Sequence, residues 1–224
     1  MQDARYGAIF DMDGVLVDSY QAHFKSWRQM AHKDGVDFTQ DDFNATFGRV
    51  SREIVTDLWG QSRTDEQILA MEDEKERLYR EIIEEDFPAM PGMKELLHDL
   101  VEDGFALAVG SSGPYENLQI VIRQLGAQSL LAATITARDV RRGKPDPEVF
   151  QLAAERIGLP TARCAVIEDA PLGITAGRAA GCATIGLAST GRMPEQLSEA
   201  DLVVTSVDQI TPAVMRELID RHSH

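Results

Sequence analysis

The sequence predicts an α/β fold, namely a Rossmann-like, mostly parallel sheet covered on both faces by helices, with an all-helical cap domain inserted near its start. Two observations support this prediction. From Pro91 onward, short continuous apolar runs alternate with helical patterns, which is typical of parallel strands buried on both faces. Between the first apolar run and residue 88, apolar residues recur at helical spacing and no convincing strand occurs.

The expected core begins with the apolar run Tyr6–Phe10, which must join the sheet because nothing else would cover it. Later strands are expected at residues 105–109, 133–136, 164–167, 183–186 and 202–204. Helices are expected between them at residues 92–103, 114–125, 147–157 and 172–180. A last helix begins with Thr211 as its N-cap and Pro212 as its first residue.

The expected insert, residues 19–87, divides the core into residues 1–18 and 88–224. A first helix begins near Tyr20, and a second, short one covers 51–59. Thr64 and Gln67 have the spacing of a capping box, which predicts the start of a long charged helix that ends near Asp86.

Charge and composition exclude several classes of partner. The 224 residues carry a formal charge of -15, from 37 acidic and 22 basic residues, so the chain would repel nucleic acid and anionic membrane surfaces. No apolar run is long enough to cross a bilayer, and the first residues lack the pattern of a signal peptide, so we expect a cytoplasmic protein. Cys164 and Cys182 lie in apolar surroundings and are expected to be buried thiols. Nothing requires more than a monomer.

Polar residues follow four of the expected strands, directly or in the next loop. Because ligands bind at the carboxyl ends of the strands of an open parallel sheet, we expect these residues to gather at one edge. In chain order they are Asp11 and Asp13, then Ser111 and Ser112 in a Gly-Ser-Ser-Gly loop, then Lys144, then Glu168 and Asp169.

These residues predict a specific chemistry only when they are considered together. Alone, each aspartate would be interpreted as a turn or N-cap residue, Ser111 as a loop serine and Lys144 as a surface charge. Together, converging carboxylates favour a hard divalent cation, and oxygen-only ligands suit Mg²⁺ better than Zn²⁺. A hydroxyl, loop amides and a lysine are the groups that hold a phosphate. The pattern predicts metal-assisted phosphoryl transfer.

The chain resembles the haloacid dehalogenase superfamily, specifically the group with a helical cap that includes β-phosphoglucomutase and small sugar-phosphate phosphatases. DMDGVLVDS matches the first motif of the family, Ser111 the second, Lys144 in GKPDP the third, and Glu168-Asp169 the fourth. These ordered motifs and the cap extend over essentially the whole chain.

The resemblance implies a role for each of these residues. Asp11 would be the nucleophile that forms an aspartyl-phosphate, and Asp13 the general acid and base. Mg²⁺ would be held by the carboxylates of Asp11 and Asp169, the backbone carbonyl of Asp13, and Glu168 directly or through water. Ser111, Ser112 and Lys144 would bind the phosphoryl group. Gly14 would let the chain turn away from the sheet, and Asp18 and Ser19 would lie in the hinge to the cap.

Three residues of the insert are candidates for substrate binding. Lys75 lies in the apolar stripe of the long helix, which fits either a lysine that covers apolar surface or a cation that meets an anionic substrate. The resemblance favours the second, because Lys75, His23 and Arg52 align with cap residues of β-phosphoglucomutase. Alone, His23 would be a core-edge histidine and Arg52 a surface charge.

The expected function is that of a Mg²⁺-dependent phosphohydrolase of small phosphorylated metabolites, in particular hexose phosphates. The alternative is a β-phosphoglucomutase, but that enzyme has a lysine and an asparagine close after its motif serine, where this chain has Ser112-Gly113-Pro114-Tyr115. Two further alternatives are a phosphonatase, with Lys75 forming a Schiff base, and a non-catalytic phospho-acceptor, for which Asp13 would have no use.

Overall fold

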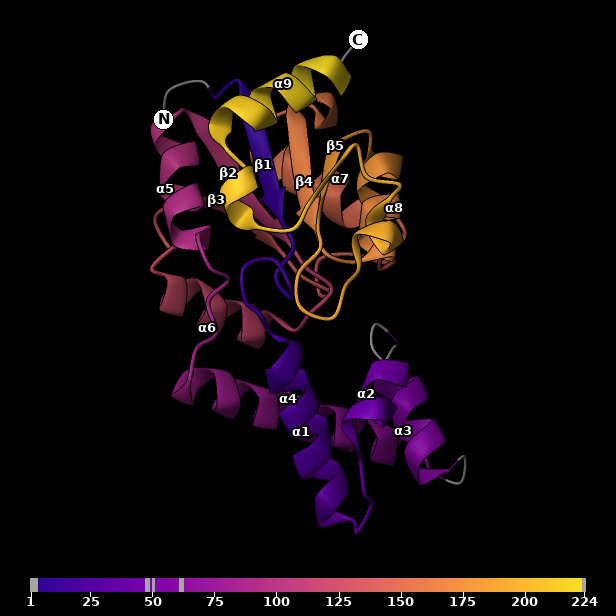
Figure 1. Cartoon of the computed structure of the whole chain (residues 1–224). Helices are drawn as coiled ribbons and strands as arrows, with labels where there is room; N and C mark the ends of the chain where they lie inside the picture. Colours follow the sequence, from indigo (N-terminus) through magenta and orange to yellow (C-terminus); the bar gives the residue numbers. More distant parts are fainter. Residues whose placement is uncertain (1–3, 47–48, 50, 61–62, 223–224) are drawn as a thin grey trace. The chain divides into compact units, whose positions relative to one another are not determined.

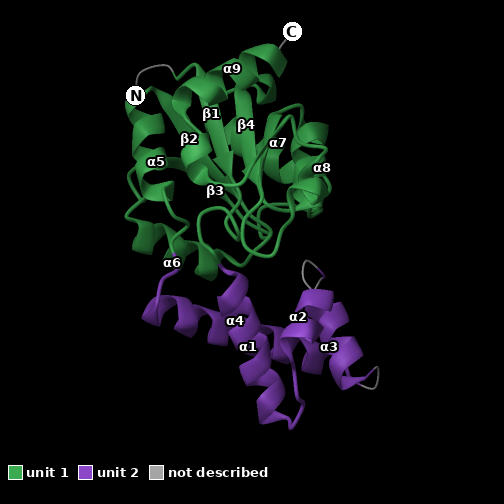
Figure 2. Cartoon of the chain, viewed as in Figure 1, with its two compact units in different colours: residues 1–18, 89–224 green, residues 19–88 purple. Residues whose placement is uncertain are grey.

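The chain divides into two compact units. The computed structural model describes residues 4–46, 49, 51–60 and 63–222. Unit 1 comprises Met1–Asp18 and Ala89–His224, and unit 2 comprises Ser19–Pro88 (Figure 2). Unit 2 differs from the expected insert, residues 19–87, by Pro88 alone.

Unit 1 is built on a single sheet that, within the described residues, has six strands, all parallel, in the order β3-β2-β1-β4-β5-β6 (Figure 1). Strand β1 lies between β2 and β4, so that Ile9 is opposite both Ala108 and Val166. The strands are β1 (Tyr6–Phe10), β2 (Phe105–Gly110), β3 (Leu131–Ile135), β4 (Cys164–Glu168), β5 (Ala183–Leu187) and β6 (Leu202–Val204). The expected parallel sheet is confirmed; β3 is displaced by one or two residues from its expected bounds.

Helices cover both faces of this sheet. Ile9 points to the face where Phe150 and Ala176, from α7 and α8, complete a buried cluster. Ala8 and Phe10, which alternate with Ile9 and point to the other face, are buried as well. The helices of unit 1 are α5 (Met93–Glu102), α6 (Tyr115–Leu125), α7 (Glu148–Arg156), α8 (Pro171–Ala180) and α9 (Pro212–His222), with short 3-10 turns at Thr161–Arg163, Pro194–Leu197 and Val207–Gln209.

Local signals at the ends of these helices act as the sequence predicts. Gly126 ends α6 in the left-handed conformation, and Thr211 Oγ1 accepts a hydrogen bond from the Val214 N–H at the start of α9. Cys164 and Cys182 are free and buried, and burial raises the pKa of the Cys164 thiol to about 12. These thiols are packing residues rather than reactive groups.

Unit 2 consists, in its described part, of helices that enclose their own core. They are α1 (Tyr20–Lys33), α2 (Gln40–Thr46), α3 (Ser51–Trp59) and α4 (Asp65–Glu85). Aromatic rings of Phe24, Trp27 and Phe38 dominate this core. The capping box of Thr64 and Gln67 is present. Helix α2 was not predicted, because seven residues are too few to show a period.

Among the described residues, no helix is both long enough and apolar enough to span a membrane. The longest helix, α4, is a charged helix of unit 2.

Candidate active site

The end of β1 brings Asp11 into the sheet edge and then reverses the chain. The Asp11 N–H donates to the Ile167 carbonyl at 2.9 Å, which extends the ladder past β1, and the Gly14 N–H donates to the Val17 carbonyl at 2.8 Å. Gly14 has a φ of +72°, as the predicted sharp turn requires. A Cβ at this position would also lie 2.4 Å from Asp169 Oδ2. Gly14 therefore permits both the turn and the close approach of Asp169.

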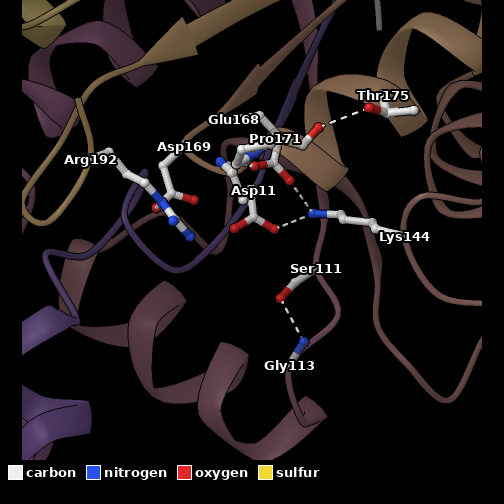
Figure 3. Close-up of polar contacts among 10 residues, drawn as sticks. Asp11, Ser111, Gly113, Lys144, Glu168, Asp169, Pro171, Thr175 and Arg192 are labelled. Carbon is white, nitrogen blue, oxygen red and sulfur yellow. Dashed lines mark hydrogen bonds and ion pairs between the residues drawn. The ribbon is translucent and has the colours of Figure 1, made fainter. Parts of the chain in front are cut away.

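Lys144 is the cation that contacts two members of the carboxylate group, Asp11 and Glu168 (Figure 3). Its Nζ lies 2.5 Å from Asp11 Oδ1 and 2.6 Å from Glu168 Oε1, and its side chain is only 9% exposed. Burial raises the pKa of Asp11 to about 7; Lys144 opposes this rise, while the charges of Glu168 and Asp13 add to it. Burial alone would lower the pKa of Lys144, but Asp11 and Glu168 outweigh it and raise that pKa above its ordinary value.

The acidic pair at the end of β4, its last residue Glu168 and the following Asp169, lies at the N-terminus of α8. Glu168 Oε2 accepts a hydrogen bond of 2.8 Å from the N–H of Ala170, the residue that caps α8, and the positive end of the helix dipole favours the carboxylate there. A Cβ on Gly173 would lie 1.8 Å from Glu168 Oε1, so only glycine leaves room for this carboxylate. Sequence reasoning missed Gly173, although a glycine in the first turn of a helix is a signal of close packing.

Asp11, Glu168 and Asp169 offer carboxylate oxygens that all lie within 4.8 Å of one another, and all three residues are buried. Burial raises the pKa of Asp169 well above its ordinary value, and the charges of Glu168 and Asp11 add to this rise. Gathered carboxylates at a dry site need positive charge, and hard oxygen donors fit a divalent cation such as Mg²⁺. This cluster is therefore able to hold a metal ion.

Asp13 and the loop after β2 lie beside the cluster. A Cβ on Gly113 would be 3.7 Å from Asp13 Oδ2, so the Asp13 carboxylate approaches this loop. Ser111 is buried; its N–H donates to the Ile135 carbonyl, and its Oγ accepts from the Gly113 N–H at 2.9 Å. The Ser111 hydroxyl can therefore donate its own proton in a hydrogen bond to an anion. Ser112 is exposed.

Arg192, a residue that sequence reasoning missed, lies next to Asp169. It belongs to the loop between β5 and β6, and its Nε is 3.7 Å from Asp169 Oδ2. Both side chains are nearly buried (Figure 3). The rule that polar groups gather after the carboxyl ends of parallel strands would have identified it if applied to the fifth strand as well.

The three candidates of unit 2 have different surroundings. Lys75 is buried; its Nζ lies 2.9 Å from His23 Nδ1 and 2.7 Å from Glu76 Oε1, and it faces the rings of Trp27 and Tyr79. The His23 ring stacks on Tyr79. The Lys75 ammonium is thus held inside unit 2 and does not extend into water.

Arg52 is exposed at the start of α3 and forms an ion pair of 2.7 Å with Asp65. Such an exposed pair contributes little to stability. Its location fits the ordinary surface charge as well as it fits a residue that binds an anion.

The acidic, serine and lysine residues after β1 to β4 define the haloacid dehalogenase class of α/β proteins. Residues 7–181 match the family model for haloacid dehalogenase-like hydrolases, and the chain belongs to this family.

Comparison with similar proteins indicates the class of reaction that this chain catalyses. The chain is 34% identical to hexitol phosphatase A of Escherichia coli, over 92% of this chain and 93% of that protein. It is 32% identical to validoxylamine A 7'-phosphate phosphatase of Streptomyces hygroscopicus subsp. limoneus, over 91% and 94%. The crystal structure of β-phosphoglucomutase from Clostridium difficile superposes with a TM-score of 0.83 at 27% identity, over 97% and 98%. The protein is an enzyme that acts as a phosphatase or phosphotransferase.

Proposed function

We propose that the protein is a Mg²⁺-dependent phosphohydrolase of small phosphorylated metabolites, with hexose phosphates as its substrate class. The observation that supports this best is the buried contact between Lys144 and Asp11 inside a group of three carboxylates. A carboxylate and a phosphate are both anions and repel each other. Attack of one on the other therefore requires cations close to the carboxylate oxygens and to the phosphate oxygens.

In this proposal Asp11 is the nucleophile. One of its oxygens attacks phosphorus, and the bond from phosphorus to the sugar oxygen breaks while Asp13 gives its proton to that oxygen. Asp13 then takes a proton from water, the water oxygen attacks phosphorus, and the bond to Asp11 breaks. Asp11 Oδ1 accepts a hydrogen bond from Lys144, and we assign the attack on phosphorus to Oδ2.

Lys144, Ser111 and Ser112 hold the phosphoryl oxygens in this scheme. Lys144 also offsets the charge around Asp11, and Ser111 offers the proton of a hydroxyl whose oxygen is fixed by Gly113. Preorganised donors of this kind stabilise the charge that develops in the transition state.

The metal ion would be held by the carboxylates of Asp11 and Asp169 and the backbone carbonyl of Asp13. Both oxygens of Glu168 already accept hydrogen bonds, from Lys144 and from the Ala170 N–H, which favours a water-mediated role for this residue. When bound, Mg²⁺ supplies positive charge to the phosphoryl oxygens and screens the repulsion between substrate and carboxylates.

His23, Arg52 and Lys75 are proposed to bind the substrate. Lys75 is the best supported of the three, because its buried ammonium contacts His23 and two aromatic rings, and its ion-pair partner Glu76 is 19% exposed and can turn to water when an anionic substrate binds. The names of the two phosphatases above, one for hexitol phosphates and one for validoxylamine A 7'-phosphate, support a small phosphorylated metabolite as substrate.

A phosphate-release screen tests the proposal. Hexose 1-phosphates, hexose 6-phosphates and hexitol phosphates are each incubated with the full chain, with Mg²⁺ or with a chelator. We expect release for at least one of them, dependent on Mg²⁺, and none from the Asp11→Asn variant. Near-normal release by that variant would overturn the assignment of the nucleophile.

β-Phosphoglucomutase activity is the second candidate, because the C. difficile mutase shares the fold over nearly the whole chain. Incubation with β-glucose 1-phosphate and a trace of the 1,6-bisphosphate separates the two. The phosphatase proposal predicts free phosphate; glucose 6-phosphate without free phosphate would establish the mutase instead.

A further inference from the structure

Arg192 is the nearest cation to Asp169 among the described residues. Lys144 contacts Asp11 and Glu168, whereas the Arg192 Nε lies 3.7 Å from Asp169 Oδ2. Figure 3 shows its guanidinium group beside Asp169, while Lys144 approaches the other two carboxylates from the loop after β3. Two cations from different loops thus contact different members of one carboxylate cluster: Lys144 contacts Asp11 and Glu168, and Arg192 lies next to Asp169.

The loop that carries Arg192 is held in place by its own contacts. The Ala188 N–H donates to the Val204 carbonyl at 2.8 Å, and the Arg192 N–H donates to the Ser189 carbonyl at 3.0 Å. The Thr190 hydroxyl donates to Asp18 Oδ2 at 2.7 Å. The Arg192 side chain is only 11% exposed, so its position beside Asp169 is part of the folded structure and not one of many surface conformations.

The distance indicates how Arg192 acts. At 3.7 Å the two atoms form an ion pair but exceed the length of a normal hydrogen bond, so Arg192 acts on Asp169 mainly through charge and fixes its orientation only weakly. At a nearly dry site such a charge is poorly screened. It attracts the carboxylates and repels any cation that binds among them.

We propose that Arg192 is an internal counter-ion that competes with the divalent metal ion for Asp169 and thereby lowers the metal affinity of the cluster. This inference rests on the metal site in the proposed function. Arg192 is not a catalytic residue in this scheme, because its charge acts through Asp169 and not on the substrate. Its effect is a weaker metal site than the three carboxylates would form with Lys144 alone.

Calorimetric titration of MgCl₂ into the full chain tests this. Arg192→Gln removes the charge, and we expect its Mg²⁺ dissociation constant to fall by about fivefold or more. Arg192→Lys keeps the charge and should remain within about twofold of the unsubstituted protein. The matched control is Arg178→Gln: Arg178 is an exposed arginine of the same unit, 3.9 Å from Glu199, and removing its charge should leave the affinity unchanged.

The outcomes separate the two proposals. If the unsubstituted protein binds Mg²⁺ and Arg192→Gln binds it equally or more weakly, the counter-ion role is wrong and the metal site stands. If the unsubstituted protein binds no Mg²⁺, the metal site itself fails.

A purely structural arginine would lower thermal stability without tightening metal binding. Arg192→Met, which keeps an apolar side chain of similar reach, is the second neutral variant and should also bind Mg²⁺ more tightly. If Arg192→Gln and Arg192→Met both fail to fold while Arg192→Lys folds, the charge of Arg192 is needed for folding and the proposal is wrong.

Discussion

Lys144 Nζ lies 2.5 Å from Asp11 Oδ1, across 133 positions of the sequence. The same ammonium contacts Glu168, so one lysine from the loop after β3 links the carboxylate that follows β1 to the one that ends β4. Parallel order in the sheet makes this possible, because β1 is the direct neighbour of β4 and their carboxyl ends lie at one edge. The repulsion between these buried acids is therefore offset within the fold.

Replacing Lys144 by methionine should destabilise the metal-free protein. The substitution leaves Asp11 and Glu168 buried without their cation, and removal of one partner of a buried pair costs about 3 kcal/mol or more. Urea unfolding with a chelator present measures the change. In the Asp11→Asn background the same substitution should cost less, because one acid is already neutral. An equal cost in both backgrounds would show that the two residues are not coupled.

The stability of the Asp11→Asn variant relative to the unsubstituted protein should rise between pH 4.5 and pH 8, both without metal; the lost contact with Lys144 adds a difference that does not change with pH in this range. The pKa of Asp11 is about 7 in the folded protein and ordinarily 3.8, so the folded state binds the proton more tightly. Its contribution to the free energy of unfolding therefore falls as pH rises from about 4 to 7. Asparagine resembles the neutral acid and removes this loss, which is on the order of 3 kcal/mol.

Urea unfolding at a series of pH values, with a chelator present, gives the difference between the two proteins. It should grow between pH 4.5 and 7 and level off above. A difference that is constant with pH would show that Asp11 titrates normally. Because only the difference is used, acids far from the site do not affect the comparison; Asp169, whose pKa the charge of Asp11 helps to raise, contributes to it.

The sheet, the helical insert and the carboxylate cluster were predictable from the sequence, because each rests on a local pattern. Short apolar runs give strands, and parallel order then brings Asp11, Lys144 and Glu168 to one edge without any further information. The roles of these residues remain proposals. Arg192 and Gly173 were missed for a different reason: their importance depends on which side chain lies opposite them in space, and no spacing along the chain encodes that.

Replacing Gly173 by alanine should displace Glu168. In an ordinary helix this change would stabilise the protein, but here the new Cβ would lie 1.8 Å from Glu168 Oε1. Relief requires the carboxylate or the first turn of α8 to move, and such overpacking costs about 1–3 kcal/mol. We expect a lower melting temperature and weaker Mg²⁺ binding by calorimetry.

The control is Gly143→Ala, where a Cβ would meet nothing within 4 Å. It should melt within a few degrees of the unsubstituted protein. Gly173→Ala with unchanged stability and metal binding would contradict the close approach of Glu168.

Replacing Lys75 by methionine should reduce kcat/KM for a phosphosugar substrate by about tenfold or more, mainly through KM, while changing the free energy of unfolding by about 1 kcal/mol or less. Methionine keeps the apolar contacts with Trp27 and Tyr79, and the removed ammonium no longer has to be desolvated. Glu76, whose side chain is 19% exposed, can turn to water.

The control is Lys25→Met, at an exposed position of α1. It removes the same charge and should leave both kcat/KM and the free energy of unfolding unchanged. If Lys75→Met instead retained full kcat/KM and lost stability, Lys75 would be a structural cation that holds His23, and the substrate role would pass to other residues of unit 2.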